Sequence, residues 1–365
     1  MKIAILGTRG IPNHYGGFEQ FAEYFSVHAA SKGHEVYVYN SSLHPFKEKE
    51  YQKVQLIHCK DFENSIGTAG QFIYDLNCIL DTRKRAFDVI LQLGYTSSSI
   101  WYPLLPKKSI IVTNMDGLEW KRTKYGTLTK KFLAFAEKLA VKSSDYLIAD
   151  SKGIESYLQK KYAVNSRFIA YGATQFTTPN QEVLKAYHCT PYGYNMLIAR
   201  MEPENNIETI LDGVVKSSKK LPFLVIGSTQ NTFGTYLKRK YKDELSIRFL
   251  EGVYNLEHLN NLRYFSNLYF HGHSVGGTNP SLLEAMASKA LIVAHHNEFN
   301  KAIVEEDGFY FSTSKEAAHH LETITKEKHL QKVENGFSKI KTHFDWKLIN
   351  DTYLNFLEAC VQSKA

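Results

Sequence analysis

The stretch HGHSVGGTNPSLLEAMASKALIVAHH, residues 271–296, contains a loop, a helix and a strand in succession. NLYFHG, at 267–272, is apolar and has the length of a buried strand, as has ALIVAHH at the end of the stretch. Between them, Pro280 favours the first position of a helix and Asn279 is well suited to cap it. Two strands joined by a helix predict a parallel unit, and therefore an α/β fold.

Glu284 interrupts the apolar face of that helix. One interpretation is a capping box, because Ser281 and Glu284 have the spacing at which a hydroxyl and a carboxylate satisfy each other's backbone donors. With Pro280 as the first helical residue, however, Glu284 lies beyond the box position. The alternative is a ligand-binding carboxylate behind a helix start that favours anions, and Glu284 then has no structural role. The N–H groups of this anion-binding turn belong to Gly277, Thr278 and Asn279.

Apolar runs of strand length alternate with helix-length segments along the chain. The runs are rich in β-branched and aromatic residues, and most end at Gly, Asn or Asp, which is typical of buried parallel strands. Helix-length segments such as 18–32 and 126–142 separate them. In the first half we expect strands at 2–7, 35–40, 54–59, 88–94, 109–115, 145–150 and 167–172. In the second half we expect them at 195–200, 222–227, 246–252, 267–272, 290–296 and 308–311.

Length and pattern together predict the domain organisation. A chain of 365 residues exceeds what one hydrophobic core usually serves. The alternation is broken only at 173–192, where prolines and threonines replace it. We therefore expect two Rossmann-like parallel-sheet domains facing a central cleft, at 1–180 and 181–345, with a C-terminal helix, 346–365, packing near the first domain.

Composition indicates an ordinary globular protein, since 43% of the residues are hydrophobic. The run MKIAILGTRG at the start is too short for the core of a signal peptide, and no apolar stretch approaches the roughly 20 residues that span a bilayer. The cysteines lack C-x-x-C spacing, so we expect free thiols, no metal site and a cytoplasmic location. They are Cys59, Cys78, Cys189 and Cys360.

Positive charge is concentrated in one part of the chain. The net charge is +7, and residues 101–175 alone contain 13 Lys and Arg against 6 Asp and Glu. Within them, 121–142 contains an amphipathic helix with lysines on its polar side. The lysines of this helix either form a solvated face or bind a negatively charged partner. That partner would be anionic lipid at the inner face of the membrane or a phosphate-bearing acceptor. Nucleic acid is disfavoured, because no nucleic-acid-binding motif accompanies the charge.

Two loops of the first half carry candidate ligand groups. In GTRGIPNHYGGFEQF, residues 7–21, Gly16 and Gly17 lie before a helix, where glycine allows the backbone to approach a phosphate or sugar. A tight structural turn is the alternative. The spacing does not match the dinucleotide fingerprint or the P-loop, which disfavours NAD and FAD. The second loop, TNMDGLEWKRTKYG at 113–126, contains Asp116, Lys121 and Arg122 within a few residues. These charges either bind the acceptor or transfer a proton, or they form ion pairs in an ordinary surface loop.

GGTNPSLLEAMA, residues 276–287, resembles the C-terminal donor-site motif of the retaining GT-B glycosyltransferases of family 4. That motif has two glutamates separated by seven residues, and the second matches Glu284. ARMEPENN, residues 199–206, resembles the family's strand-end arginine at Arg200. GTRGIPNHYGGFE together with DGLEWKR is similar to a branch described as rhamnosyltransferase-like. The resemblance covers nearly the whole chain.

Two positions depart from the family pattern. Gly276 occupies the position of the first glutamate, and Asn205 occupies that of a lysine that meets the diphosphate. The groups left for the pyrophosphate are Arg200, the N–H groups of Gly277, Thr278 and Asn279, and Lys121 or Arg122.

The resemblance also implies roles for individual residues. Glu284 accepts hydrogen bonds from the ribose hydroxyls of a nucleotide, and Tyr254 lies near the base unless it is a core residue. His14, Tyr15 and Asp116 are the candidates for the sugar acceptor. Asp116 either deprotonates the reacting hydroxyl or positions it.

The function implied is metal-independent transfer of a sugar, with rhamnose suggested by the branch, from a nucleotide-diphosphate sugar to a saccharide or lipid-linked saccharide in glycan synthesis. No cofactor is implied beyond this co-substrate. The main alternative is a nucleotide-sugar epimerase or hydrolase on the same GT-B fold. A non-enzymatic sugar-binding protein is disfavoured, because such proteins usually carry an export signal.

Overall fold

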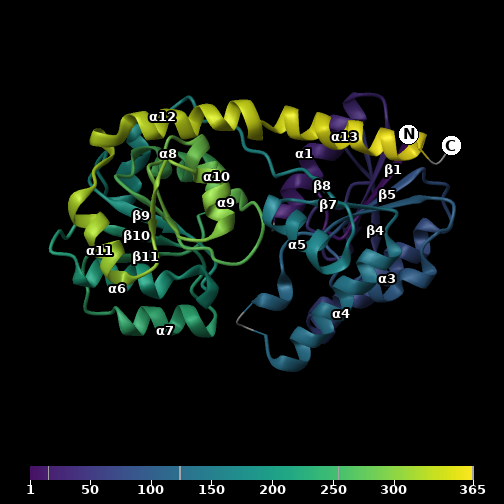
Figure 1. The fold of residues 1–365 in the computed structure, drawn as a ribbon, viewed down its shortest axis with the longest axis horizontal. Coiled ribbons are helices and arrows are strands. Elements are labelled where there is room, and N and C mark those ends of the chain that lie inside the picture. Colours follow the sequence, from purple (N-terminus) through teal and green to yellow (C-terminus); the bar gives the residue numbers. More distant parts are fainter. Residues whose placement is uncertain (15, 123–124, 254, 364–365) are drawn as a thin grey trace. The chain divides into compact units, whose positions relative to one another are not determined.

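The computed structural model describes residues 1–14, 16–122, 125–253 and 255–363. The chain forms two compact units that are not continuous in sequence (Figure 1). Unit 1 comprises Met1–Trp120, Gly126–Tyr171 and Trp346–Ala365, and unit 2 comprises Lys121–Tyr125 and Gly172–Asp345. Each unit is built around one sheet.

The described residues of unit 1 form an eight-stranded sheet in the order β3-β4-β2-β1-β5-β6-β7-β8. All neighbouring strands are parallel except β3, which is antiparallel to β4. The centre of the sheet is almost entirely buried, which explains its continuous apolar runs. The strands are β1 (Lys2–Leu6), β2 (Glu35–Ser41), β3 (Glu50–Tyr51), β4 (Val54–Cys59), β5 (Val89–Leu93), β6 (Ile110–Asn114), β7 (Tyr146–Ala149) and β8 (Arg167–Phe168).

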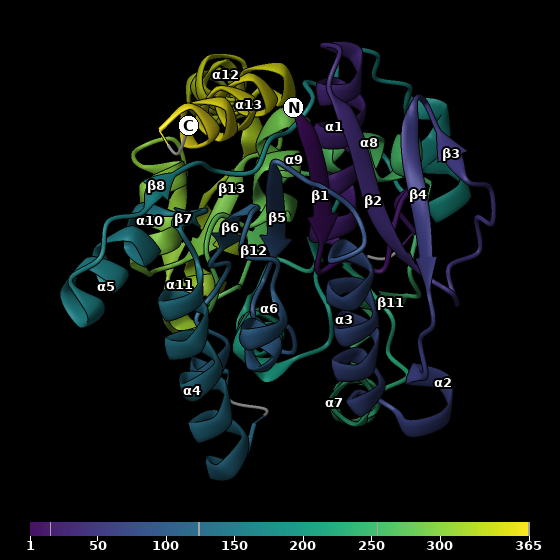
Figure 2. The same ribbon diagram turned by 90° about the vertical axis from the view of Figure 1, so that its right-hand side faces the viewer.

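Helices cover both faces of this sheet, with α1 and α13 on one side and α3 and α4 on the other (Figures 1 and 2). The α-helices are α1 (Gly17–Ser31), α2 (Glu63–Ile66), α3 (Ala69–Thr82), α4 (Thr127–Ser143), α5 (Lys152–Tyr162) and α13 (Trp346–Gln362), and the short 3₁₀ helices are η1 (Ser99–Leu104) and η2 (Glu119–Lys121).

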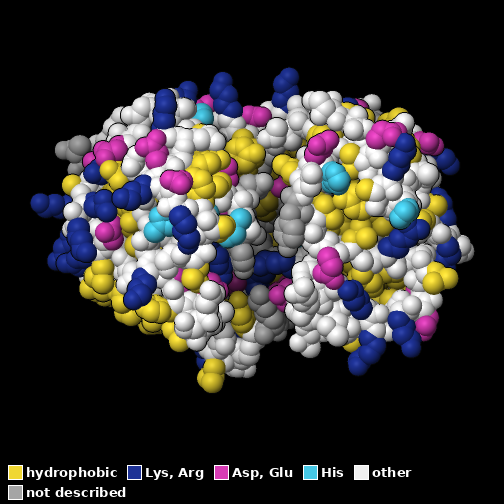
Figure 3. Space-filling model, turned by 180° about the vertical axis from the view of Figure 1, so that it is seen from behind, with side chains coloured by type: hydrophobic (Ala, Val, Ile, Leu, Met, Phe, Trp, Pro, Cys, Tyr) yellow, Lys and Arg dark blue, Asp and Glu magenta, His cyan; other side chains and the backbone are white. Residues whose placement is uncertain are grey.

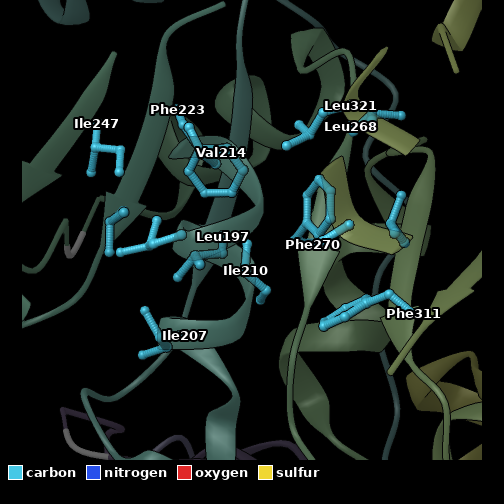
Figure 4. Packing of buried hydrophobic residues seen from close by; sticks show 14 of the residues in the cluster. Leu197, Ile207, Ile210, Val214, Phe223, Ile247, Leu268, Phe270, Phe311 and Leu321 are labelled. Atoms are coloured by element: carbon cyan, nitrogen blue, oxygen red, sulfur yellow. The ribbon is translucent and has the colours of Figure 1, made fainter. Parts of the chain in front are cut away.

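Unit 2 contains, in its described part, a six-stranded parallel sheet in the order β11-β10-β9-β12-β13-β14. Leu197, Phe223 and Phe270 of this sheet pack with helix residues such as Ile210 and Val214 into one hydrophobic core (Figure 4). The strands are β9 (Asn195–Ile198), β10 (Phe223–Ile226), β11 (Ile247–Leu250), β12 (Tyr269–His271), β13 (Ile292–His295) and β14 (Phe309–Phe311).

The helices of unit 2 alternate with these strands. They are η3 (Gln181–Tyr187), η4 (Pro203–Asn205), α6 (Ile207–Lys216), α7 (Thr232–Lys240), α8 (Leu256–Phe265), α9 (Pro280–Ala287), α10 (Glu298–Val304), α11 (Ser314–Thr323), η5 (Lys326–His329), α12 (Leu330–Lys339) and the π-helical turn η6 (Ile340–Phe344).

The strand positions agree with the sequence pattern, apart from β3. Residues Gln52 and Lys53 join β3 to β4, and both have positive φ, 47° and 69°. A two-residue hairpin loop of this kind usually contains Asn-Gly or Asp-Gly. Because the chain uses Gln and Lys instead, the turn has no recognisable signal in the sequence.

Helix α13 packs against α1 within unit 1 through aromatic and polar contacts. Trp346 stacks on Tyr24 with ring centroids 4.6 Å apart. Tyr353 is buried, its ring lies 4.5 Å from that of Phe21, and its hydroxyl accepts a 2.9 Å hydrogen bond from Asn114 Nδ2. The C-terminal helix is therefore part of the core of unit 1.

Replacement of Tyr353 tests this packing. We expect Tyr353→Ala to lower the free energy of unfolding by about 3–5 kcal/mol, because it leaves a cavity beside Phe21. Tyr353→Phe keeps the ring and removes only the acceptor for Asn114, so its cost should be about 1 kcal/mol. Urea unfolding followed by circular dichroism measures both, and equal costs for the two variants would contradict the cavity explanation.

Candidate functional site

The carboxyl ends of β9 and β12 lie side by side in the sheet of unit 2. Phe270 of β12 is in register with Leu197 of β9, and both strands run in the same direction. Ligands of open α/β sheets bind at this edge. The structure thereby brings together two loops that the sequence analysis selected separately, 199–206 after β9 and 272–279 after β12.

Hydrogen bonds join these two loops directly. The backbone N–H and the hydroxyl of Ser274 donate to the carbonyl oxygen of Glu204, at 3.1 and 2.7 Å. Asn206 Nδ2 donates to the carbonyl oxygen of Gly272 at 2.8 Å. A Cβ atom on Gly272 would lie 2.0 Å from the carbonyl oxygen of Asn205, so only glycine permits this approach.

Asn205 has a structural role in this arrangement. Its side chain is buried, and its Nδ2 donates a 2.8 Å hydrogen bond to the carbonyl oxygen of Arg200. It therefore holds the loop that carries Arg200, whose own side chain is exposed. The chain thus uses a neutral amide where the related motif has a lysine.

His273 is a site residue that the sequence analysis did not select. Its ring stacks on that of the buried His271, with centroids 4.4 Å apart, and its Nδ1 has no hydrogen-bond partner among the described residues. Burial, followed by the nearby charges of Arg200 and Arg122, lowers the pKa of His273 to about 3. The imidazole is consequently neutral at physiological pH. The sequence feature that could have identified His273 is its position in HGH, directly after a predicted strand.

Helix α9 begins as the sequence predicts. Pro280 is its first residue, and the Asn279 side chain accepts a 3.0 Å hydrogen bond from the N–H of Ser281. The capping box is excluded, because the hydroxyl of Ser281 instead pairs with that of Tyr269 at 2.8 Å. Gly276 has a φ of 130°, a conformation that favours glycine.

A small hollow lies in front of this helix start. It is lined by the turn itself and by Phe299 and Asn300 of α10, and Asn300 Nδ2 donates a 3.0 Å hydrogen bond to the carbonyl oxygen of His273. Thr278 is buried within the turn. The lining residues are His273, Ser274, Val275, Gly276, Gly277, Asn279, Phe299 and Asn300.

Glu284 does have a structural role, contrary to the expectation from the sequence. Its Oε2 lies 2.5 Å from Nη2 of Arg263, at the end of α8. The Arg263 side chain is 1% exposed and that of Glu284 is 22% exposed. The carboxylate therefore neutralises a buried guanidinium, and part of the Glu284 side chain remains exposed. An arginine so deeply buried has no signature in a single sequence.

The first of the two first-half loops, residues 7–21, belongs to unit 1. Gly16 caps α1 and Gly17 is its first residue, and the turn is held by Glu19, whose Oε1 accepts a 2.8 Å hydrogen bond from the N–H of Arg9. His14 is exposed and its ring lies 4.3 Å from that of His44. Tyr15 and Tyr254 lie outside the residues that the structure describes.

Asp116 follows β6 at the carboxyl edge of the unit 1 sheet. Its side chain is half-buried, and Gly117, with a φ of 64°, turns the chain directly after it. Lys121 and Arg122 group with unit 2, where an Arg122 guanidinium nitrogen is 3.6 Å from Oε1 of the buried Glu204. Asp116 therefore belongs to unit 1, whereas the two cations that follow it in sequence belong to unit 2.

The described parts of the chain lack both metal-binding clusters and membrane-spanning helices. No group of three His, Cys, Asp or Glu side chains is arranged to hold a metal ion there. In the same residues, no helix has both the length and the apolar composition needed to cross a bilayer.

Comparison with known proteins identifies the fold. Residues 1–174 match the family described as "Domain of unknown function (DUF1972)". No curated protein matches the sequence. A sucrose-phosphate synthase from Thermosynechococcus elongatus is similar in structure over 100% of both chains, with a TM-score of 0.81 and 16% identity. HepE of Anabaena, in complex with UDP and glucose, is similar over 98% of this chain and 100% of its own, with a TM-score of 0.76 and 17% identity.

A glycosyltransferase from Rickettsia africae is similar over 100% of both chains, with a TM-score of 0.71 and 13% identity. These likenesses show that the chain has the GT-B fold, which confirms the fold predicted from the sequence.

The ion pair between Arg263 and Glu284 gives a prediction for stability. We expect Glu284→Ala to lower the free energy of unfolding by about 2–3 kcal/mol, because it leaves the buried guanidinium without its carboxylate. The double variant Arg263→Met/Glu284→Leu removes both charges and should recover most of that loss. Urea unfolding of Arg263→Met, Glu284→Leu and the double variant completes a cycle that uses the same substitution at each position. Strictly additive effects would show that the pair contributes nothing.

Proposed function

We propose that the protein is a glycosyltransferase that moves a sugar from a nucleotide-diphosphate sugar to a saccharide or lipid-linked saccharide acceptor. One observation carries the proposal: the joined loops after β9 and β12 place an arginine beside a glycine turn that opens a capped helix, with Glu284 one turn further on. A fold shared with HepE, whose structures contain UDP, glucose and UDP-glucose, supports it.

The donor binds to unit 2 in this proposal. Its diphosphate accepts hydrogen bonds from the N–H groups of Gly277, Thr278 and Asn279, and from Arg200. Departure of the leaving group builds negative charge on the diphosphate, which these fixed donors stabilise. The mechanism therefore needs no metal ion and no cofactor.

Glu284, whose side chain is partly exposed, binds the ribose hydroxyls in this proposal. Its ion pair with Arg263 fixes the carboxylate in one position before the nucleotide arrives, so little side-chain freedom is lost on binding. Tyr254 is assigned to the base on the resemblance alone.

The departures from the family pattern shape the sugar site. Gly276 offers no side chain to the donor sugar, and Asn205 bonds its own loop instead of a phosphate. His273, neutral and beside the turn, is the side chain left to hydrogen-bond a sugar hydroxyl or phosphate oxygen. Membership of family 4 rests on the motifs GGTNPSLLEAMA and ARMEPENN, and rhamnose as the sugar rests on GTRGIPNHYGGFE together with DGLEWKR.

The acceptor binds to unit 1. Asp116 follows β6, and the described residues of the loop before α1 follow β1, both at the carboxyl edge of its sheet. Asp116 contacts the reacting hydroxyl, either as its base or as the group that orients it. His14, Gly16 and Gly17 belong to the loop at the same edge, and Tyr15 is assigned to the acceptor on the sequence alone. Lys121 and Arg122, which belong to unit 2, add positive charge for the diphosphate of the donor.

Helix α4 supplies a surface for an anionic membrane at the cytoplasmic face. Leu128 and Phe135 are 83% and 53% exposed, and they share one face with Lys131, Lys138 and Lys142 by their spacing of three and four residues. Exposed apolar groups among lysines are typical of helices that lie in a lipid interface. In Figure 3, Lys and Arg side chains gather at the outer edge of unit 1 and hydrophobic side chains are exposed below them.

Ligand binding and product analysis test the proposed reaction. A nucleotide diphosphate at about 100 times its Kd should raise the melting temperature by about 5 °C or more. Arg200→Gln should abolish the shift, whereas Arg239→Gln, an exposed arginine on α7 of the same unit, should keep it. If Arg263→Met/Glu284→Leu folds, it should also lose the shift.

The reaction itself is followed by mass spectrometry of the sugar products. A disaccharide or longer product in the presence of an acceptor supports transfer. Free sugar or an epimer formed from the donor alone would instead favour the hydrolase or epimerase. No shift with any nucleotide diphosphate would refute the nucleotide-sugar hypothesis.

Flotation with lipid vesicles tests the membrane surface. The protein should bind vesicles that contain phosphatidylglycerol and not vesicles of pure phosphatidylcholine. Lys131→Glu/Lys138→Glu should weaken binding about ten-fold or more, since each lysine near an anionic surface contributes about 1 kcal/mol. The matched control is Lys315→Glu/Lys341→Glu, which makes the same charge change in unit 2. Equal binding by the two double variants would refute a role for α4.

A further inference from the structure

Glu137, in the middle of α4, is a buried carboxylate with an unusual number of hydrogen-bond donors. Its side chain is 1% exposed. Tyr157, Lys161 and Tyr162 donate to Oε1 at 2.7, 2.8 and 2.7 Å. Trp120 Nε1 donates to Oε2 at 3.2 Å, and the hydroxyl of Tyr95 lies 3.4 Å from the same oxygen.

These donors come from three successive parts of the unit 1 sheet. Tyr95 follows β5, Trp120 lies in η2 after β6, and the other three are on α5 after β7. Strands β5, β6 and β7 are neighbours, so their carboxyl ends lie next to one another. One carboxylate thus ties together the segments that leave this edge of the sheet.

The hydrogen-bond donors in the cluster around Glu137 suit a charged carboxylate and occupy its lone pairs. Lys161 provides the compensating positive charge, and a buried carboxylate without such partners would be strongly disfavoured. Burial and then the bond to Glu137 raise the pKa of Tyr162 to about 12 and also raise that of Tyr157, so both hydroxyls stay protonated donors. The four donors at 2.7–3.2 Å fill a carboxylate's capacity of about four lone pairs, which leaves none for a substrate.

The cluster is connected to Asp116 through the chain. Trp120 lies four residues after Asp116, and its ring is also covered by Lys161, with Nζ 5.2 Å from the ring centroid. Nearer to Asp116, the hydroxyl of Tyr95 lies 3.4 Å from the carbonyl oxygen of Gly117. Gly117 and Trp120, near the two ends of the segment 116–120, therefore each contact a group at Glu137, and Tyr95 shares its single O–H proton between the carbonyl oxygen and the carboxylate.

We propose that Glu137 is a positioning residue, which holds the Asp116 segment in the conformation that presents Asp116 to the acceptor hydroxyl. This assignment rests on the proposed glycosyl transfer. Glu137 does not touch the substrate and acts through Trp120 and Tyr95. A displacement of the reacting group by about 1 Å can lower a rate by about 100-fold, so a distant holder of Asp116 matters to the reaction.

Glu137→Gln tests the proposal, because glutamine keeps the shape, removes the charge and turns one acceptor into a donor. Amide hydrogen exchange should become faster in residues 116–121 and remain unchanged in β2. The kcat/KM for the acceptor should fall by about 10–100-fold, while the Kd of the nucleotide diphosphate, measured by calorimetry, should stay within about two-fold of the wild type.

Three further variants complete the design. Glu155→Gln alters an α5 carboxylate outside the cluster and should behave as the wild type. Trp120→Phe keeps an aromatic ring, although a smaller one, and removes the N–H, so it should reproduce the loss in part. This variant decides the question if Glu137→Gln does not fold. Asp116→Asn removes the carboxylate itself, and the loss of kcat/KM in this variant is the value with which the loss in Glu137→Gln is compared.

Unchanged exchange in residues 116–121, or acceptor kinetics equal to those of Glu155→Gln, would overturn the role of Glu137. Absence of any transfer by the wild-type protein is a separate result. It would refute the proposed function, while the hydrogen exchange would still show whether Glu137 holds the segment.

Discussion

The candidate donor site depends on one close contact, between Gly272 and the carbonyl oxygen of Asn205. A side chain at Gly272 would collide with that oxygen, so glycine is required for the loops after β9 and β12 to meet. Once they meet, Ser274 and Asn206 can bond across them. The contact places the exposed Arg200 and the turn before α9 on one rigid support. Fixed donors of this kind are what a reaction that develops charge on a diphosphate requires.

Buried charge organises both units, and in each case a carboxylate is committed to a protein partner. Glu284 neutralises Arg263 in unit 2, and Glu137 collects donors from three elements in unit 1. The two differ in what remains for a ligand. Glu284 keeps part of its side chain exposed, which leaves it accessible to the ribose in the proposed donor complex. Glu137 is fully enclosed, so its influence on a substrate must pass through the segment that it holds.

The sequence predicted much of the fold and part of the site. Alternating apolar runs located the strands, because burial of a strand leaves a local pattern, and Pro280 located the start of α9. The short strand β3 was missed because its turn uses Gln52 and Lys53, neither of which signals positive φ. His273 was overlooked because a histidine after a strand has no distinctive spacing.

By itself, the sequence determined the positions of the strands, the helix start at Pro280 and the glycine turn before it, since these depend on residues near one another in the chain. Only the tertiary structure decided the partners of the charged groups. Arg263 meets Glu284 across 21 residues, and Trp120 meets Glu137 across 17. Such pairs leave no local pattern, because their energy comes from burial that exists only after the helices have packed.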